Sequence, residues 1–361
     1  MKKILILIFS LCFRLGFSQA GSGTENIIVV TTDGFRWQEV FGGMDSLIAV
    51  DSAFNQNDMK GIFKNYWAFT QEERRKALMP FLWGTMERHG QIYGNRKYHV
   101  DVDNANPYWF SYPGYSEIFC GYVDTAINSN KYPPNPHTNV LEYINHQPGF
   151  AGKVSAFCAW DAFDRILNEE RSGFPVTCGA EMCGGKNPDV EEKTINALKA
   201  DSYLPFGEEE YEDVYTHYMA MDYLQKKKPR VLYISYGETD EWAHAGHYKD
   251  YLDAAHRVDK WLGDLWNFIQ TDPQYKNRTA LFVTVDHGRG DRVKEKWTSH
   301  NNKIEDSHQI WFAVMGPGIP AKGEIKTPVQ IYQKQFAETI AEMLGLQFKC
   351  EHPVADGLKG R

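Results

Sequence analysis

Several features are missing from this sequence of 361 residues, and each absence excludes a class of protein. No apolar run reaches the roughly 18 residues that a membrane-spanning helix needs. No basic run is longer than Lys226-Lys227-Lys228, and 47 acidic residues against 39 basic ones give a net charge of −8. These absences argue against a membrane-spanning protein and against a nucleic-acid-binding surface. What is present, 42% apolar, 14% aromatic and 24% charged residues, is the composition of a folded globular protein.

Residues 1–20 have the pattern of a secretory signal peptide. Two lysines precede the apolar run at residues 4–13, and Arg14 interrupts that run, which disfavours a membrane anchor. Cleavage would remove three bases and no acid, so the mature charge would be 36 − 47 = −11. We therefore predict an exported protein, periplasmic or secreted, with no transmembrane anchor in the mature chain and one catalytic domain at residues 21–361.

Cysteines are few, and export changes how they are interpreted. An oxidising compartment permits disulfides. Cys178 and Cys183 flank a glycine-rich loop and are the candidate pair for a short disulfide. The odd number of cysteines after residue 20 leaves at least one of them free or paired between molecules.

Short β-branched runs alternate with helical patterns, which predicts an α/β fold: a three-layer α/β/α sandwich with a mainly parallel central sheet. The region around residues 133–210 is rich in asparagine, proline and glycine, and we interpret it as a loop-rich insertion that either contacts substrate or lies on the surface. The predicted strands cover residues 26–32, 153–158, 231–236, 281–285 and 310–315, and apolar residues recur at helical spacing over 251–269 and 331–344.

Acidic and histidine side chains follow three of these predicted strands. Asp33-Gly34 follows the first strand, Asp240 and His244 follow residue 236, and Asp286-His287 follows residue 285. Each has an ordinary explanation as a turn or helix-cap residue. The carboxyl ends of parallel strands meet at one edge of a sheet, however, and ligands bind there. The coincidence therefore favours a binding site.

Aspartate and neutral histidine together suit zinc. Asp240 and His244 have the spacing that lets one helical turn present two ligands to one ion. Neighbouring residues at a strand end point in opposite directions, so Asp286 and His287 would supply two different ions. Two such ions clamp the attacking and leaving oxygens of a displacement at phosphorus.

A nucleophile is expected at a helix start, where backbone amides favour a phosphate anion. Ser111 precedes Pro113 at a predicted first turn, with Glu117 and apolar residues after it. Ser116 is a competing hydroxyl in the same segment. In isolation Ser111 would be interpreted as an ordinary N-cap.

Together these motifs resemble the alkaline phosphatase superfamily, and within it the type I phosphodiesterase and nucleotide pyrophosphatase branch. In that family the last ligand is a histidine shortly before a strand that runs into Gly-Pro; His300 matches it before Gly316-Pro317, and His308 is the alternative. The resemblance implies a first zinc site of Asp33, Ser111, Asp286 and His287, with Ser111 as the nucleophile, and a second zinc site of Asp240, His244 and His300.

The resemblance leaves the phosphate contacts open. The branch usually has Asn-His after the aromatic-Pro of the nucleophile motif, and this chain has Gly114-Tyr115. Asn130 is ranked first for the asparagine that binds a nonbridging phosphate oxygen, ahead of Asn128 and Asn135. The cations that could bind a terminal phosphate are Arg36, Lys153, Arg165 and Arg289.

The implied function is hydrolysis of small-molecule phosphate mono- or diesters through a phosphoseryl intermediate at a centre of two divalent ions, zinc being the expected metal. One alternative is a sulfatase-like or phosphonate-ester hydrolase of the same superfamily. Tyr115 stands where the sulfatase maturation signal needs arginine, which disfavours the sulfatase. The other alternative is a secreted, non-catalytic ligand-binding protein with structural calcium, but calcium prefers oxygen ligands and the predicted sites contain histidines.

Overall fold

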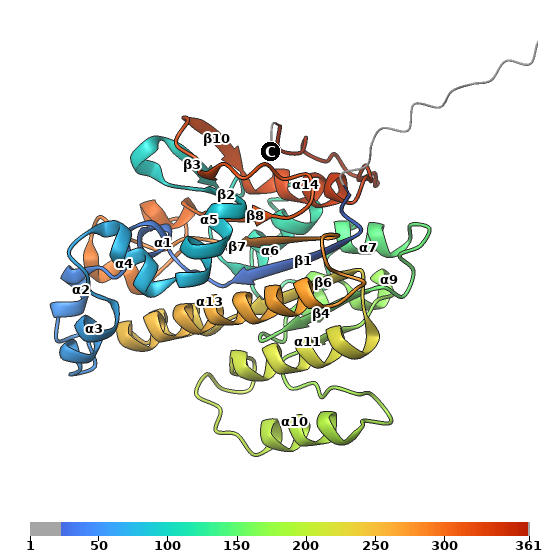
Figure 1. Cartoon of the computed structure of the whole chain (residues 1–361), viewed down its shortest axis with the longest axis horizontal. Coiled ribbons are helices and arrows are strands. Elements are labelled where there is room, and N and C mark those ends of the chain that lie inside the picture. The colour runs from blue at the N-terminus through green and yellow to red at the C-terminus, as the bar shows by residue number, and fades with distance from the viewer. Residues whose placement is uncertain (1–22, 360–361) are drawn as a thin grey trace, which may run out of the picture.

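The computed structural model describes residues 23–359, so the predicted signal peptide lies outside the described residues. Its central element is an eight-stranded sheet of order β5-β4-β6-β1-β7-β8-β2-β9, beside a two-stranded sheet of β10 and β3 (Figure 1). The strands are β1 (Asn26–Thr32), β2 (Gly90–Tyr93), β3 (Val100–Asp103), β4 (Val154–Cys158), β5 (Val176–Cys178), β6 (Val231–Tyr236), β7 (Thr279–Thr284), β8 (Phe312–Met315), β9 (Gly323–Glu324) and β10 (Val329–Tyr332).

The sheet is mainly parallel, as predicted. In the described eight-stranded sheet, only β8 runs against the others, since it pairs antiparallel with both β7 and β2. Strand β1 lies between β6 and β7, and Ile28 pairs with Leu232 on one side and with Leu281 on the other. All seven residues of β1 are buried, which explains why its sequence is almost continuously apolar or β-branched.

Helices cover both faces of the sheet. Tyr233 and Tyr236 lie three residues apart in β6, so their side chains point to opposite faces. The helices are α1 (Trp37–Gly42), α2 (Ser46–Val50), α3 (Met59–Tyr66), α4 (Gln71–Leu78), α5 (Glu87–His89), α6 (Ser111–Cys120), α7 (Val140–Asn145), α8 (Phe163–Ile166), α9 (Glu169–Ser172), α10 (Val190–Ala200), α11 (Asp213–Lys227), α12 (Glu238–His244), α13 (Tyr248–Thr271) and α14 (Phe336–Met343).

Aromatic contacts assign α6 and α13 to different layers. The Tyr233 ring packs 4.7 Å from Phe119 of α6, and the Tyr236 ring packs 5.3 Å from Trp261 of α13, measured between ring centroids. Figure 1 shows α11 and α13 on one side of the sheet and α6, α7 and α14 on the other. The predicted three-layer α/β/α sandwich is therefore confirmed.

Two details of the predicted architecture need correction. The region around residues 133–210 is not an insertion throughout, because it contributes β4 and β5 to the central sheet. The predicted helix over 331–344 begins only at Phe336, and Ile331 instead lies in β10, where it pairs with Val102 of β3. A short apolar run before a helix has the same composition whether it joins a strand or extends the helix.

The disulfide prediction is also wrong. Cys178 and Cys183 are free thiols in the structure. The Cys178 Sγ lies 3.3 Å from the Asp161 carbonyl oxygen, and the Cys183 Sγ lies 3.2 Å from the Asn196 side-chain oxygen. The glycine-rich loop turns the two side chains toward different partners. None of the helices in residues 23–359 is long and apolar enough to cross a membrane.

Candidate active site

The carboxyl ends of β1 and β7 bring a first group of predicted ligands together. Asp33 follows β1, and Asp286 and His287 follow β7. The His287 Nε2 lies 3.2 Å from Asp33 Oδ1 and 3.3 Å from Asp286 Oδ2. One ligand atom of each residue lies within 4.8 Å of the others, and all three residues are buried. The strand order of the sheet thus assembles the first predicted metal site, apart from Ser111.

Hydrogen bonds aim these carboxylates at one point. Tyr115 donates from its hydroxyl to Asp33 Oδ2 over 2.9 Å, and the Gly34 amide donates to Asp286 Oδ1 over 3.1 Å. The other oxygens, Asp33 Oδ1 and Asp286 Oδ2, are buried without a hydrogen-bond donor. Each carboxylate is therefore held by one oxygen while the second oxygen faces His287.

Two glycines allow these loops to approach closely. Gly34 has a φ of +57°, and a Cβ there would lie 2.5 Å from Asp240 Oδ1. Gly114, in the first turn of α6, has no Cβ to collide with the Asp286 carbonyl oxygen, which would be 2.5 Å away. Larger side chains at these positions would separate the strand ends from each other and from α6.

Helix α6 places Ser111 at this first group. Ser111 is its first residue, it is buried, and its Oγ lies 3.4 Å from His287 Nε2. Tyr115 follows one turn later on the same face of the helix, which explains its hydrogen bond to Asp33. The helix N-terminus also supplies a partial positive charge beside the serine oxygen, favourable for a bound phosphate anion.

The second predicted group assembles next to the first. His244 Nε2 lies 3.0 Å from Asp240 Oδ2 and 2.9 Å from His300 Nε2. The His300 ring stacks on His287 with 3.9 Å between ring centroids, and His287 Nε2 lies 3.8 Å from Asp240 Oδ1. The two groups thus adjoin at His287.

The donor set fits divalent cations. His287 Nδ1 lies 2.9 Å from the Gly288 carbonyl oxygen and His300 Nδ1 lies 3.3 Å from the Trp109 carbonyl oxygen, so each Nδ1–H has an acceptor and each Nε2 keeps its lone pair. In that tautomer, lone pairs of carboxylate oxygens and imidazole nitrogens face one another. A bound divalent cation would neutralise this excess of negative charge more fully than the single proton that His287 can take up.

The ionisation of the buried groups agrees with this interpretation. Burial raises the pKa of Asp286 well above its ordinary value, and the charge of Asp33 adds to the increase. Burial alone would lower the pKa of His287, but the carboxylates of Asp286 and Asp33 raise it to about 9. Negative charge is in excess at this position, and a proton on His287 only partly balances it.

Asp240 has a different environment. Its Oδ1 pairs with the guanidinium of Arg289, which is fully buried and also donates to the carbonyl oxygens of Trp297 and Thr298. Burial alone would raise the pKa of Asp240, but Arg289 holds it well below its ordinary value, with help from His244 and His300. Asp240 is therefore a carboxylate at neutral pH.

A cleft of about 510 Å³ opens onto both groups. Its lining includes Ser111 and ligands of each group, together with Asn130, Lys131 and Arg165. Asn130 accepts a hydrogen bond from the Tyr112 amide through Oδ1, over 3.0 Å, which places it at the start of α6. The cleft is lined by Asp33, Ser111, Asn130, Lys131, Trp160, Asp161, Arg165, Glu209, Glu210, Asp240, Glu241, His244 and His300.

Several sequence candidates lie away from this cleft. Asn128 is exposed, Asn135 is buried against Ser116, and Ser116 itself is buried inside α6. Lys153 directly precedes β4 and therefore lies at the opposite edge of the sheet. His308 packs on Trp109 outside the ligand groups.

Two arginine candidates are also internal. Arg36 is buried and paired with Glu39, and Arg289 is buried and paired with Asp240. Neither lines the cleft. Among the four cations considered from sequence, Arg165 alone lines the described cleft.

Sequence reasoning missed three residues of the cleft and its surroundings. From sequence, Tyr115 was notable only as a departure from the phosphodiesterase and sulfatase motifs, whereas in the structure it positions Asp33. Lys131 is the second cleft cation, next to Asn130 in the chain. Glu210 is buried with Oε1 lacking a hydrogen-bond donor, and burial raises its pKa well above the ordinary value. In sequence, Glu210 is one of three consecutive glutamates. Such a run is typical of a solvated surface, so nothing in the sequence indicated that Glu210 is buried at the cleft.

Comparison with known proteins agrees with this geometry. The family described as type I phosphodiesterase / nucleotide pyrophosphatase matches residues 55–351, a range that contains all the predicted ligands except Asp33. No curated protein matches the chain significantly.

Solved structures show the same fold at low sequence identity. The lipoteichoic acid synthase LtaP from Listeria monocytogenes has a TM-score of 0.59 and 14% identity, over 94% of this chain and 76% of that one. The alkaline phosphatase PafA has a TM-score of 0.59 and 12% identity, over 90% and 96%. The phosphonate monoester hydrolase of Agrobacterium radiobacter has a TM-score of 0.55 and 12% identity, over 93% and 76%. The chain therefore belongs to the type I phosphodiesterase / nucleotide pyrophosphatase family and is a hydrolase of phosphoric ester bonds with the alkaline phosphatase fold.

Proposed function

We propose that this protein hydrolyses small phosphate mono- or diesters, with Ser111 as the nucleophile at a centre of two zinc ions. The observation that carries the proposal is the position of Ser111. Its Oγ lies at the N-terminus of α6, 3.4 Å from His287 Nε2, and Ser111 lines the cleft that both ligand groups share. A hydroxyl at that point is accessible to a substrate in the cleft, lies beside the ligand groups and is at the positive end of the helix dipole.

The residues of the chain would have the following roles. Asp33, Asp286, His287 and Ser111 would hold one ion, and Asp240, His244 and His300 the other. Bound zinc would supply positive charge that favours the serine alkoxide and stabilises charge developing on the phosphoryl oxygens.

Ser111 Oγ would attack phosphorus in line as the bond to the leaving alcohol breaks, giving a phosphoserine ester. Water would then attack the same phosphorus from the leaving side, releasing Ser111 and phosphate or a phosphate monoester. Tyr115 would keep Asp33 oriented throughout.

Asn130 is our candidate for binding a nonbridging phosphate oxygen. Its Oδ1 accepts from the Tyr112 amide, which leaves the Nδ2 amide hydrogens for the substrate. The aspartate variant Asn130→Asp keeps an acceptor for Tyr112 but replaces the donor with a charge that repels phosphate. We expect it to lower kcat/KM by roughly 100-fold while thermal unfolding stays near wild type. Steady-state kinetics would check this, with Asn128→Asp as the exposed control; equal effects of the two variants would contradict the assignment.

The function itself is tested with four p-nitrophenyl esters that share one leaving group. Zinc-loaded protein would be assayed with p-nitrophenyl phosphate, bis(p-nitrophenyl) phosphate, p-nitrophenyl phenylphosphonate and p-nitrophenyl sulfate, each with and without a chelator. We expect chelator-sensitive hydrolysis of at least one phosphate ester at a higher kcat/KM than the sulfate ester. Faster sulfate hydrolysis would overturn the phosphoesterase assignment, and no hydrolysis of any ester would favour a binding protein.

Phosphonate-ester hydrolysis is the second candidate function. The structural likeness to a phosphonate monoester hydrolase supports it at the level of the fold, and phosphonate monoesters present the same single negative charge to the cleft as phosphate diesters do. Comparing kcat/KM for p-nitrophenyl phenylphosphonate with kcat/KM for the two phosphate esters distinguishes the two candidate functions.

We also propose that the protein is exported, on the evidence of the sequence pattern at residues 1–20.

A further inference from the structure

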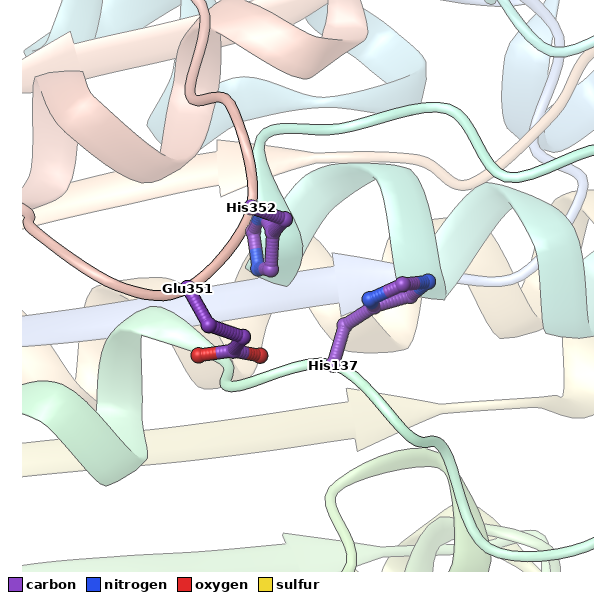
Figure 2. Close-up of side chains that lie close together, drawn as sticks. All are labelled: His137, Glu351 and His352. Carbon is purple, nitrogen blue, oxygen red and sulfur yellow. The ribbon is translucent and has the colours of Figure 1, made fainter.

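A second cluster of metal-binding side chains lies away from the catalytic cleft. It joins the loop between α6 and α7, residues 121–139, to the C-terminal segment, residues 344–359. One ligand atom each of His137, Glu351 and His352 lies within 4.8 Å of the others. Figure 2 shows the two imidazole rings and the carboxylate turned toward a common space. None of these residues lines the catalytic cleft.

His137 is arranged as metal-binding histidines are. Its Nε2 lies 2.8 Å from Asp124 Oδ2, so the carboxylate accepts the Nε2–H and fixes the tautomer. The lone pair is then on Nδ1, on the other side of the ring, and Figure 2 shows a ring nitrogen of His137 on the side of Glu351 and His352. A carboxylate behind a histidine orients the ring and increases its basicity toward a metal.

His352 has too many acceptors for a neutral ring. Its Nδ1 lies 2.9 Å from the Pro353 carbonyl oxygen and its Nε2 lies 3.0 Å from the Thr138 carbonyl oxygen. A neutral imidazole has one N–H, so one nitrogen presents a lone pair to an oxygen unless a cation is bound there. Tyr122 stacks on the ring with 5.3 Å between centroids and restricts its rotation.

Cys350 offers a sulfur donor beside His352, outside the group of three residues whose ligand atoms lie within 4.8 Å of one another, so its side chain would have to turn toward His137 and Glu351 to become a fourth ligand. Its Sγ lies 3.3 Å from His352 Nε2, and Cys350 is partly exposed rather than enclosed in the core. In a tetrahedral zinc site with bonds of about 2.0 Å to nitrogen and 2.3 Å to sulfur, adjacent ligand atoms lie about 3.5 Å apart. The observed separation is close to that value.

Glu351 supplies a fixed charge. Its two carboxylate oxygens accept from the Thr138 amide over 2.8 Å and from the Thr138 hydroxyl over 2.7 Å, and each oxygen keeps a lone pair. The side chain is therefore an oriented carboxylate beside two imidazoles.

We propose that His137, Cys350, Glu351 and His352 bind a zinc ion that is separate from the catalytic centre. Two imidazoles, a thiolate and a carboxylate form a donor set that favours zinc over calcium or magnesium, which prefer oxygen ligands. The ion joins the C-terminal segment to the 121–139 loop, whose residues Asn130 and Lys131 line the catalytic cleft. It is thus a structural clamp that holds part of the substrate-binding wall.

Cobalt substitution tests the proposal without relying on catalysis. A Co²⁺–thiolate bond gives a near-ultraviolet charge-transfer band, and the proposed catalytic ligands include no cysteine, so the band reports on this site alone. We expect wild-type protein loaded with Co²⁺ to show the band, and we expect Cys350→Ser and His352→Gln to lose it. Cys183→Ser, which removes a thiol elsewhere, should keep it.

Metal analysis gives the second readout. His352→Gln should contain one zinc equivalent fewer per chain than wild type, with kcat for ester hydrolysis retained within several-fold. Absence of the cobalt band from wild-type protein would overturn the proposal. Because the band does not depend on turnover, failure here is distinct from failure of the proposed hydrolase function.

Discussion

Replacing Ser111 with alanine should lower kcat/KM for phosphate ester hydrolysis by about four to six orders of magnitude. The variant removes the attacking oxygen, while the remaining ligands of the first group keep their mutual contacts. Metal content and thermal unfolding should therefore stay close to those of wild type, since alanine is also favourable in a helix. Initial rates on the p-nitrophenyl esters, with zinc analysis of the same preparations, measure both effects.

Ser116 is the matched control for this experiment. It lies in the same helix and is equally buried, but its Oγ contacts Asn135 rather than the ligand groups. Ser116→Ala should lose about 1 kcal/mol of stability with the hydrogen bond and leave kcat/KM nearly unchanged. Wild-type rates in Ser111→Ala would show that another group is the nucleophile.

Replacing Asp240 with alanine should remove about one metal ion per chain and lower activity by more than roughly 1,000-fold. It should also lower the free energy of unfolding of the metal-free protein by about 3–5 kcal/mol, because Arg289 loses its buried carboxylate partner. The combined loss of metal and of stability distinguishes Asp240 from a residue that only binds substrate. Metal analysis and denaturant unfolding in the presence of chelator separate the two effects.

The neighbouring Glu241 provides the control for Asp240. It lines the same cleft from the same helix, but the described ligand groups do not include it. Glu241→Gln should retain both catalytic ions and native stability. If Asp240→Ala retained both ions, the second site would have to be moved to other residues.

Several features of the fold could be predicted from local sequence. The apolar run at residues 26–32 forms the central strand because a strand covered on both faces needs apolar residues at every position. The spacing of Asp240 and His244 places both on one face of α12. By contrast, Ile331 pairs with β3 rather than extending α14, because a partner strand more than 200 residues away in the chain determines its conformation.

Part of the candidate site could also be predicted from local sequence. Ligands at strand ends were recognisable because parallel strands deliver their carboxyl ends to one edge. The choice among three asparagines was not determined locally, since each lies in a loop whose path depends on its packing. Arg289 was a reasonable phosphate ligand by composition, and only its burial against Asp240 shows that its charge is already paired.

By itself, the sequence determined five strands of the central sheet, β1, β4, β6, β7 and β8, and the aspartates and histidines that follow three of them, because hydrophobic periodicity and turn chemistry are local properties. Only the tertiary structure decided which of those side chains meet. It placed Tyr115 behind Asp33, kept Cys178 apart from Cys183, and brought His137 next to His352. Those contacts join residues that are distant in sequence or turned apart by a loop, and burial, charge and hydrogen bonding at such contacts depend on the packed chain as a whole.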